Sequence, residues 1–403
     1  MVQTQSEIKQ LLQRKIFGHK TVRNYNPYSR AVLSKLSKCH TIGIGVHQYK
    51  CNNSSCCHVH HQYHCCGDRH CPNCGGAKRQ QWVEDRMSEL LPIKYFHVVF
   101  TLPAELRSLV MGNRKKMYNL LFEGSQYTLL KLGRDPKWLG ATLGVISILH
   151  THGQELSFHP HVHCIVSGGG VDKEGMWKNC NRSKDSFLFP RRVMEKMFKA
   201  YFLNKLEDYL ADSELNVEDG LALHEAIKLV KYKKWNVYAK APFAGPAQII
   251  EYLGRYTHKV AITSHRIKHI SDTHITFDYK DYADGSKVKQ MTLTNEEFLR
   301  RFEQHILPKK FVKLRHCGYL CHRGKTERLK LLFEQMKLHP AMPKVSISVA
   351  LRVLIDTGVD ITLCPACKAG KMILIQTLII HNGQLVDAAT LRNRGSPNIN
   401  ITK

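Results

Sequence analysis

The chain has 403 residues, and its 60 Lys and Arg outnumber its 33 Asp and Glu, which gives a formal net charge of +27. This length is enough for roughly two to four domains, and the positive charge favours a polyanionic partner, with DNA or RNA as the first candidate. No run of about 18 apolar residues occurs, and residues 1–13 lack an apolar signal core. We therefore expect no membrane partner and a cytoplasmic location.

Hydrophobic periodicity predicts the elements in chain order. Residues 1–38 should form a polar helical segment, residues 39–74 a loop rich in Cys and His, and residues 76–92 a helix. Further strands are expected at 95–102, 144–150 and 161–167, and further helices at 104–132, 190–212, 248–263 and 298–306. Beyond residue 270 the pattern predicts short strands and a basic stretch, with a polar, disordered tail after residue 391.

Eight of the 14 cysteines lie between Cys39 and Cys74, mixed with histidines. Zinc takes four sulfur or nitrogen ligands, and paired cysteines on tight turns, such as Cys71-Pro72-Asn73-Cys74, supply them two at a time. Without a signal peptide, metal binding explains this cluster better than disulfides do. The candidate ligands, enough for one or two structural zinc ions, are Cys39, His47, Cys51, Cys56, Cys66, His70, Cys71 and Cys74.

A second Cys-x-x-Cys pattern, Cys364 to Cys367, stands near the end of the chain. It could join Cys317 and Cys321 in another zinc site, but the spacing of that pair is unusual for zinc. An isolated turn is the favoured interpretation of these residues.

The sequence His161-Val162-His163 predicts a metal site. Residues two apart in a strand point to the same side, so both imidazoles would face one point while Val162 and Cys164 face the core. Two such imidazoles suit a metal ion. The strands 144–150 and 161–167 should pair as an antiparallel hairpin, which makes His150 our first choice for a third ligand. The other possibilities are Gln154, His159 and His97.

Tyr252 and Tyr256 are four residues apart, so on a helix they share one face with β-carbons about 6 Å apart. Alone, such a pair more often packs in a core. Beside a histidine metal site in a basic chain, we interpret them as nucleophiles that attack a phosphodiester to form phosphotyrosine. Basic residues flank them and are candidate phosphate contacts: Lys240, Arg255, Lys259 and Arg266.

Several motifs in fixed order resemble the two-tyrosine HUH transposases of rolling-circle insertion sequences, the family called insertion sequence ninety-one. The motifs are Phe96–Pro103, His161-Val162-His163 followed by Gly168-Gly169-Gly170, and Glu251–His258. The stretch from Tyr63 to Cys74 resembles the zinc-binding domain of that family, and the likeness covers about residues 39–320. The chain departs from the family pattern at His152, Cys317 and Cys321.

This resemblance implies an α+β fold, with an HUH endonuclease domain built on a central antiparallel sheet with flanking helices, an N-terminal zinc-binding domain and a small C-terminal α/β region. The expected division is 1–38 for the N-terminal helical segment, 39–92 for the zinc-binding domain, 93–270 for the nuclease and 271–403 for the C-terminal domain. It also implies a bacterial transposase, associated with the nucleoid when bound to DNA. Such an enzyme nicks and rejoins single-stranded DNA at transposon ends through 5′-phosphotyrosine, with Mg or Mn at His161 and His163.

Three alternatives stay open at this point. A rolling-circle replication initiator or a relaxase would use the same chemistry. The pattern from His159 to His163 also fits the histidine-triad nucleotide hydrolases, in which a histidine rather than a tyrosine forms the adduct. A non-catalytic zinc-finger DNA-binding protein is the third, and its histidines would be structural.

Overall fold

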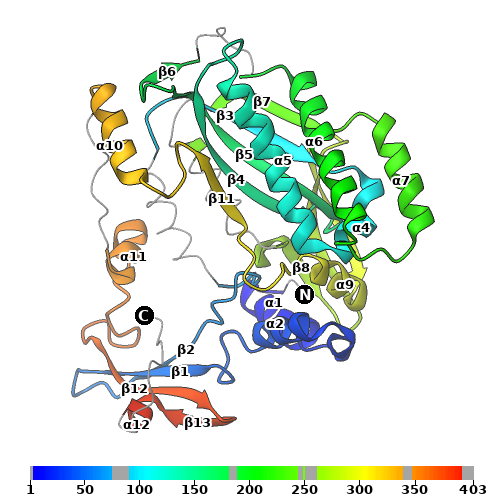
Figure 1. The fold of residues 1–403 in the computed structure, drawn as a ribbon. Coiled ribbons are helices and arrows are strands. Elements are labelled where there is room, and N and C mark those ends of the chain that lie inside the picture. Colours follow the sequence, from blue (N-terminus) through cyan, green and yellow to red (C-terminus); the bar gives the residue numbers. More distant parts are fainter. Residues whose placement is uncertain are drawn as a thin grey trace.

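The computed structural model describes residues 3–74, 90–180, 188–243, 248–249, 261–338 and 347–392. Within these residues the chain forms three antiparallel sheets with helices packed against them, which confirms the expected α+β class (Figure 1). No helix in the described part of the chain is long and apolar enough to cross a bilayer.

The central sheet carries the two strands with the histidines. Its order is β11-β4-β5-β3-β7, with β6 paired to β5, and every neighbouring pair is antiparallel. The strands are β3 (Tyr95–Thr101), β4 (Thr142–His152), β5 (Phe158–Val171), β6 (Trp177–Asn179), β7 (Val237–Phe243) and β11 (Leu314–Gly318). The sequence pattern correctly predicted β3 and the hairpin of β4 and β5, although both hairpin strands extend further than expected.

Alternation along these strands produces two apolar faces. One face packs against helices in a core that includes Phe100, Val145 and Val162, and these helices cover the sheet in Figure 1. They are α4 (Arg107–Gly112), α5 (Arg114–Arg134), α6 (Arg191–Ala211) and α7 (Gly220–Tyr232), with η3 (Ala104–Leu106) before them. The opposite face, with Ile146 and Ile165, packs against α10 (Lys325–Gln335). The histidines share this second face.

The N-terminal helices pack on a separate three-stranded sheet. The helices are α1 (Gln5–Leu11), η1 (Leu12–Phe17), η2 (Lys20–Asn24) and α2 (Pro27–Ser37). Their partners are η4 (Ser264–Arg266), β8 (Ile267–Ile270), β9 (His274–Asp281), β10 (Lys287–Thr294) and α9 (Asn295–Gln304). A capping box starts α1, because Glu7 N donates to Thr4 Oγ1 at 3.3 Å and Thr4 N donates to the Glu7 carboxylate at 2.7 Å.

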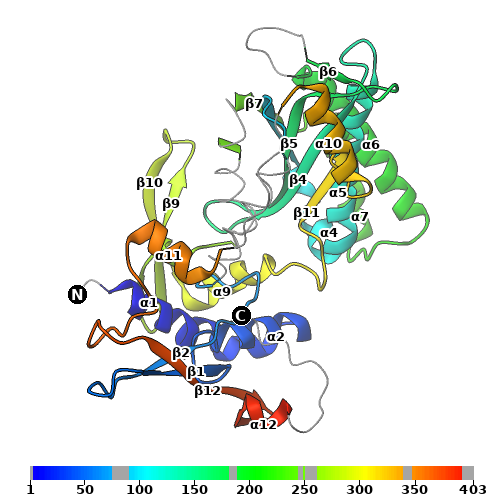
Figure 2. The ribbon, with the colours of Figure 1, turned by 90° about the vertical axis from the view of Figure 1, so that its left-hand side faces the viewer.

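The third sheet joins segments from near the two ends of the chain, with the order β13-β12-β1-β2 (Figure 1). Figure 2 shows β12 beside β1 from a second direction. Its strands are β1 (Gly45–Cys51), β2 (Val59–Tyr63), β12 (Met372–His381) and β13 (Gln384–Asp387), and nearby helices are α11 (Val349–Thr357) and α12 (Ala388–Arg392). We expected residues 39–74 to form a loop, but two strands, β1 and β2, run through them. The many His and Cys residues hid the alternation of these strands.

The expected division into four domains stays a prediction, and the three sheets connect its parts. Residues assigned to the C-terminal region enter all three sheets: β9 and β10 pack on the N-terminal helices, β11 extends the central sheet, and β12 pairs with β1. Most of the expected helix 76–92, and the expected tail, lie outside the described residues.

Candidate active site

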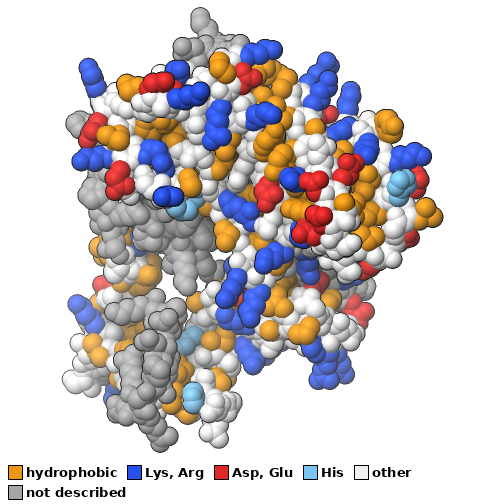
Figure 3. Space-filling view, viewed as in Figure 1, with side chains coloured by type: hydrophobic (Ala, Val, Ile, Leu, Met, Phe, Trp, Pro, Cys, Tyr) orange, Lys and Arg blue, Asp and Glu red, His pale blue; other side chains and the backbone are white. Residues whose placement is uncertain are grey.

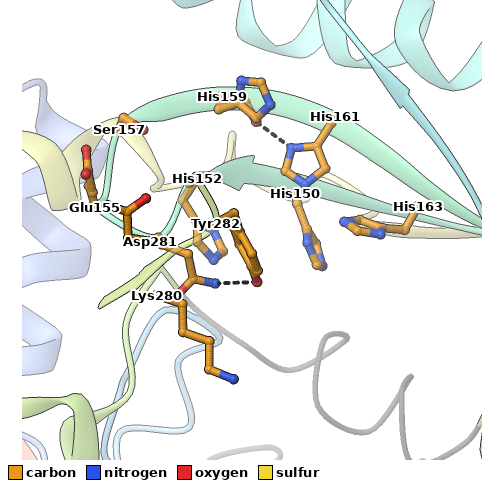
Figure 4. Close-up of a pocket in the computed structure, with 12 residues that line it drawn as sticks. His150, His152, Glu155, Ser157, His159, His161, His163, Lys280, Asp281 and Tyr282 are labelled. Atoms are coloured by element: carbon orange, nitrogen blue, oxygen red, sulfur yellow. Dashed lines mark hydrogen bonds between the residues drawn. The ribbon is translucent and has the colours of Figure 1, made fainter. Parts of the chain in front are cut away.

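Three histidines meet on one face of the central sheet. His150 on β4 lies opposite His161 on β5, and Ile148 lies opposite His163, so the antiparallel register brings the three rings together. One nitrogen from each of His150, His161 and His163 lies within 4.8 Å of the others, and their rings face a common space in Figure 4. Val162 and Cys164 are fully buried on the other face, as the alternation predicted.

Hydrogen bonds orient two of these rings. His161 Nδ1 lies 2.6 Å from the carbonyl oxygen of His159, so it donates its proton there and its lone pair is left on Nε2. His163 Nδ1 lies 2.8 Å from Nε2 of His97, and the two rings are parallel to within 4°. The same kind of bond to His97 would leave the lone pair of His163 on Nε2.

Burial keeps these imidazoles neutral. It lowers the pKa of His161 to about 4, and it lowers the pKa values of His150 and His163 well below the ordinary histidine value. Neighbouring histidines add to the effect, because a second imidazolium nearby would be repelled. A neutral imidazole is the form that ligates a metal, so the donor set fits a divalent cation without any change of protonation.

A cavity of about 400 Å³ opens over the three rings. Its walls come from the end of β4, the turn that follows it and the tip of the β9–β10 hairpin, which reaches over from the neighbouring sheet (Figure 4). The hairpin contributes Lys280, Asp281 and Tyr282. The Tyr282 hydroxyl accepts a hydrogen bond from Gln154 Nε2 at 3.4 Å. The cavity therefore presents a cation, a carboxylate and a phenol to whatever binds at the histidines.

The other residues proposed as a third ligand lie beside the group and not in it. Gln154 and His159 line the cavity, where Gln154 contacts Tyr282 and the carbonyl of His159 holds His161. His97 contacts His163 from β3. Among the described residues, the three-histidine group comprises His150, His161 and His163.

Arg266 has a different setting from the one expected of a phosphate contact. Its guanidinium is half-buried and donates to the carbonyl oxygens of Gln154 at 2.5 Å and Asp278 at 2.8 Å. It therefore ties the turn beside the cavity to β9. The backbone of Lys240 lies in β7, opposite His97, and its side chain lies outside the described residues. Tyr252, Tyr256, Arg255 and Lys259 also lie outside the described residues.

Four of the predicted zinc ligands form a compact group, which we call the first cysteine group: Cys39, Cys66, Cys71 and Cys74. The Sγ atoms of Cys39 and Cys71 are 3.6 Å apart, as are those of Cys66 and Cys74. A tetrahedral zinc site with Zn–S bonds of about 2.3 Å places its sulfurs about 3.8 Å apart. The group therefore has the spacing of a structural zinc site.

His70 and His47, the two histidines among the expected zinc ligands, lie outside the first cysteine group. His70 uses both ring nitrogens elsewhere: Nδ1 lies 2.8 Å from the Asp68 carboxylate, and Nε2 accepts from Leu307 N at 3.0 Å. His47 lies inside β1, where its Nδ1 is 2.9 Å from Thr377 Oγ1 on β12. Both side chains thus connect the cysteine-rich segment to distant parts of the chain.

Cys51 and Cys56 meet a partner that the sequence did not reveal. They group with Cys364 and Cys367 from the other end of the chain, and we call these four residues the second cysteine group. Cys317 lies instead in β11 of the central sheet. The interpretation of Cys364 and Cys367 as an isolated turn is therefore wrong, and so is their pairing with Cys317 and Cys321.

Sequence reasoning also missed the residues that the hairpin brings to the cavity. Tyr282 and Lys280 belong to no motif, and about 120 residues separate them from the histidines along the chain. Lys313 belongs to the predicted basic stretch, yet it lies half-buried near His150 and His163, and desolvation lowers its pKa to about 8. Only tertiary packing places these groups, so no local pattern could have identified them.

Comparison with known proteins identifies the class of the protein as a transposase. Residues 144–328 match the family described as "Putative transposase", and residues 8–102 match the "Transposase zinc-binding domain" of the IS91 type. The chain is 39% identical over 360 residues to "Putative transposase y4qJ" of Sinorhizobium fredii, covering 86% of this chain and 89% of the relative. It is 30% identical over 345 residues to "Transposase for insertion sequence element IS801" of Pseudomonas savastanoi pv. phaseolicola, covering 84% and 81%.

The chain therefore belongs to the IS91 family of transposases, as the motif order predicted, and it carries the zinc-binding domain of that family. The zinc-binding domain and the cysteine groups support structural zinc. No solved structure matches the chain.

Proposed function

We propose that the protein is a metal-dependent endonuclease and strand transferase that nicks and rejoins single-stranded DNA at the ends of an insertion sequence. The observation that carries this proposal is the group of three neutral histidines, one buried and two half-buried, at the base of an open cavity. The surface agrees with a DNA substrate, because Lys and Arg side chains are spread over the face of the molecule in Figure 3 and the chain has a net charge of +27.

The position of Ile249 supports Tyr252 and Tyr256 as the nucleophiles. Ile249 is fully buried in the same apolar cluster as Ile146 and Ile165, which lie on the histidine-bearing face of the sheet. Tyr252 follows three residues later, and three residues span at most about 11 Å. The segment with the tyrosines therefore starts on the correct side of the sheet for an attack at the histidines.

The chemistry is a pair of transesterifications. The hydroxyl of Tyr252 or Tyr256 loses its proton, and its oxygen bonds to the scissile phosphorus while the bond from phosphorus to the 3′-oxygen breaks. The leaving oxygen takes a proton and becomes a free 3′-OH, while the 5′-phosphate stays on the tyrosine. A bound divalent ion would polarise the phosphate and stabilise the charge on the leaving oxygen. Attack by a 3′-OH on the phosphotyrosine reverses the step and joins the strands, so no ATP is required.

The second tyrosine gives the cycle a further step. Because the first tyrosine still holds a DNA end, the other can cut a second strand before that end is released. This sequence is the rolling-circle transposition that the family resemblance implies. Of the two expected ions, Mn suits the three histidine nitrogens better than Mg, because imidazole nitrogen is a softer ligand than the oxygens that Mg prefers.

The test is a covalent-adduct assay on single-stranded oligonucleotides from the ends of the element, labelled at the 3′ end and incubated with Mn. A 5′-phosphotyrosine link leaves the labelled 3′ fragment on the protein, and mass spectrometry identifies the residue. We expect adducts on Tyr252 or Tyr256, tested separately as Tyr252→Phe and Tyr256→Phe. Tyr232→Phe is the matched control, because this side chain is 86% exposed on α7.

His161→Ala should abolish cleavage while DNA binding, measured by gel shift, is largely retained. His224→Ala, an exposed residue on α7, is the control and should cleave normally. An adduct on a histidine would instead support the histidine-triad hydrolases. Cleavage by His161→Ala at the normal rate would refute the metal assignment, and the absence of any adduct on single strands would support a DNA-binding regulator.

A further inference from the structure

We propose that the second cysteine group is a zinc site that joins the two ends of the chain. Cys51 and Cys56 come from the zinc-binding domain near the N-terminus, whereas Cys364 and Cys367 come from the segment just before β12. The site would hold the C-terminal sheet strands against β1. It is separate from the first cysteine group and from the three histidines.

The sulfur positions fit one tetrahedral ion. Cys51 Sγ lies 3.7 Å from Cys367 Sγ, and Cys56 Sγ lies 3.8 Å from Cys364 Sγ, while all four sulfurs lie within 4.8 Å of one another. The sulfur spacing expected for a Cys₄ zinc site is about 3.8 Å. The chain spacings also suit zinc, because two residues separate Cys364 from Cys367 and four separate Cys51 from Cys56.

The backbone around the group is arranged to stabilise thiolates. Asn53 N points at Cys51 Sγ at 3.4 Å, and Gly370 N points at Cys367 Sγ at 3.4 Å. Such N–H donors favour the charged form of sulfur, which is the form that ligates zinc. Gly370 also has a steric role, because a Cβ at this position would lie 2.5 Å from Cys51 Sγ. Only glycine lets the two cysteine turns approach this closely.

The group stands at the end of the ladder between β1 and β12. Cys51 pairs with Met372, and beyond it Asn52 N donates to the Lys371 carbonyl at 3.0 Å while Lys371 N donates to Asn52 Oδ1 at 2.7 Å. An ion here would fix the register between β1 and β12 at the point where both strands end.

The C-terminal segment needs such a bond because it has almost no core. Among the described residues 347–392, the buried ones are Cys364, Gly370, Ala388 and Leu391. The side chains of Ile373, Leu374 and Ile375 on β12 are about half exposed. A segment that buries so little apolar surface gains little from hydrophobic burial, and a structural metal is a common way to stabilise a small unit of this kind.

The experiment compares the zinc content of the full-length protein and its variants by mass spectrometry of the metal. Cys364→Ser/Cys367→Ser should contain one zinc ion per chain fewer than the wild type, and Cys71→Ser/Cys74→Ser should lose a different one, so that the two losses add. Cys57→Ser/Cys65→Ser is the matched control, because both residues are exposed in the same domain and outside both groups. It should keep the full content.

Hydrogen exchange supplies a second measurement that does not depend on activity. In Cys364→Ser/Cys367→Ser, the amides of β12 and β1 should exchange faster while those of β4 and β5 keep their protection. Gly370→Ala, which retains all four thiols, should also weaken zinc retention against a chelator. An unchanged zinc content in Cys364→Ser/Cys367→Ser would overturn the proposal. Disulfides joining these four cysteines in the purified protein, or iron in place of zinc, would also overturn it.

Discussion

His97 is the residue whose replacement best separates positioning from ligation at the histidine site. It lies on β3 next to the three-histidine group, and its Nε2 is 2.8 Å from Nδ1 of His163. The partner of the second ring nitrogen of a metal-bound histidine fixes its tautomer and orientation. His97→Phe keeps an aromatic ring of similar size in this buried position and removes the hydrogen bond.

The expected magnitude follows from that single bond. Loss of such an orienting partner typically weakens metal binding by roughly 10–100-fold, which is about 1.4–2.7 kcal/mol. The Mn concentration for half-maximal cleavage should therefore rise by that factor in His97→Phe, while cleavage at saturating Mn stays near the wild-type rate. In His161→Ala a ligand itself is missing, so no Mn concentration should restore cleavage.

The assay is a Mn titration of single-strand cleavage, with calorimetry of Mn binding as an independent measurement. His97→Gln is the control, because its side-chain oxygen can accept the proton of His163, so the loss should be smaller than in His97→Phe. An unchanged Mn affinity in His97→Phe would refute the reasoning. So would a loss of cleavage that saturating Mn does not restore, since that result would make His97 more than a positioning residue.

Three further predictions concern stability and the hairpin. Burial lowers the pKa of His305 to about 4, so below about pH 6.5 the unfolded chain binds a proton more readily than the folded one. The free energy of unfolding should therefore be retained above that pH and fall by about 3 kcal/mol towards pH 4. In urea unfolding, His305→Gln should show a weaker dependence of this free energy on pH. Gly318 and Gly175 both have a positive φ, but a Cβ at Gly318 would lie 1.6 Å from the Leu143 carbonyl oxygen, whereas one at Gly175 meets nothing within 4 Å. Gly318→Ala should therefore unfold at a much lower urea concentration than Gly175→Ala. Arg266→Ala should speed hydrogen exchange in the turn around Gln154, and unchanged exchange there would contradict the tie to β9.

The arrangement of the three histidines could be predicted because it depends on short-range geometry. Alternation along β5 puts His161 and His163 on one side, and a hairpin of two adjacent strands brings His150 opposite. Both rules act over fewer than about 20 residues. The hairpin of β9 and β10 obeys no such rule with respect to β4, and so Tyr282 and Lys280 could not be placed at the cavity from the sequence.

The cysteines show the same limit in another form. The spacing of Cys71 and Cys74 indicated zinc, yet a zinc site needs two further ligands, and their identity depends on long-range folding. For the first cysteine group these are Cys39 and Cys66, which lie nearby in the chain. For Cys51 and Cys56 they lie more than 300 residues away, where β12 pairs with β1. No pattern within the cysteine-rich segment contains that pairing.

One face of the central sheet carries both the three histidines and the apolar cluster that includes Ile249. On β4 and β5 the rows that carry His150 and His163 continue into Ile146 and Ile165, because residues two apart share a face. Ile249, which precedes Tyr252, packs with these isoleucines and not with the core under α5 and α6. A shift of one residue in the register of β5 would turn His161 and His163 towards that other core and would also remove part of the apolar surface on which Ile249 packs. The alternation that brings the three histidines together therefore also forms the apolar surface on which Ile249 packs, three residues before the proposed nucleophile Tyr252.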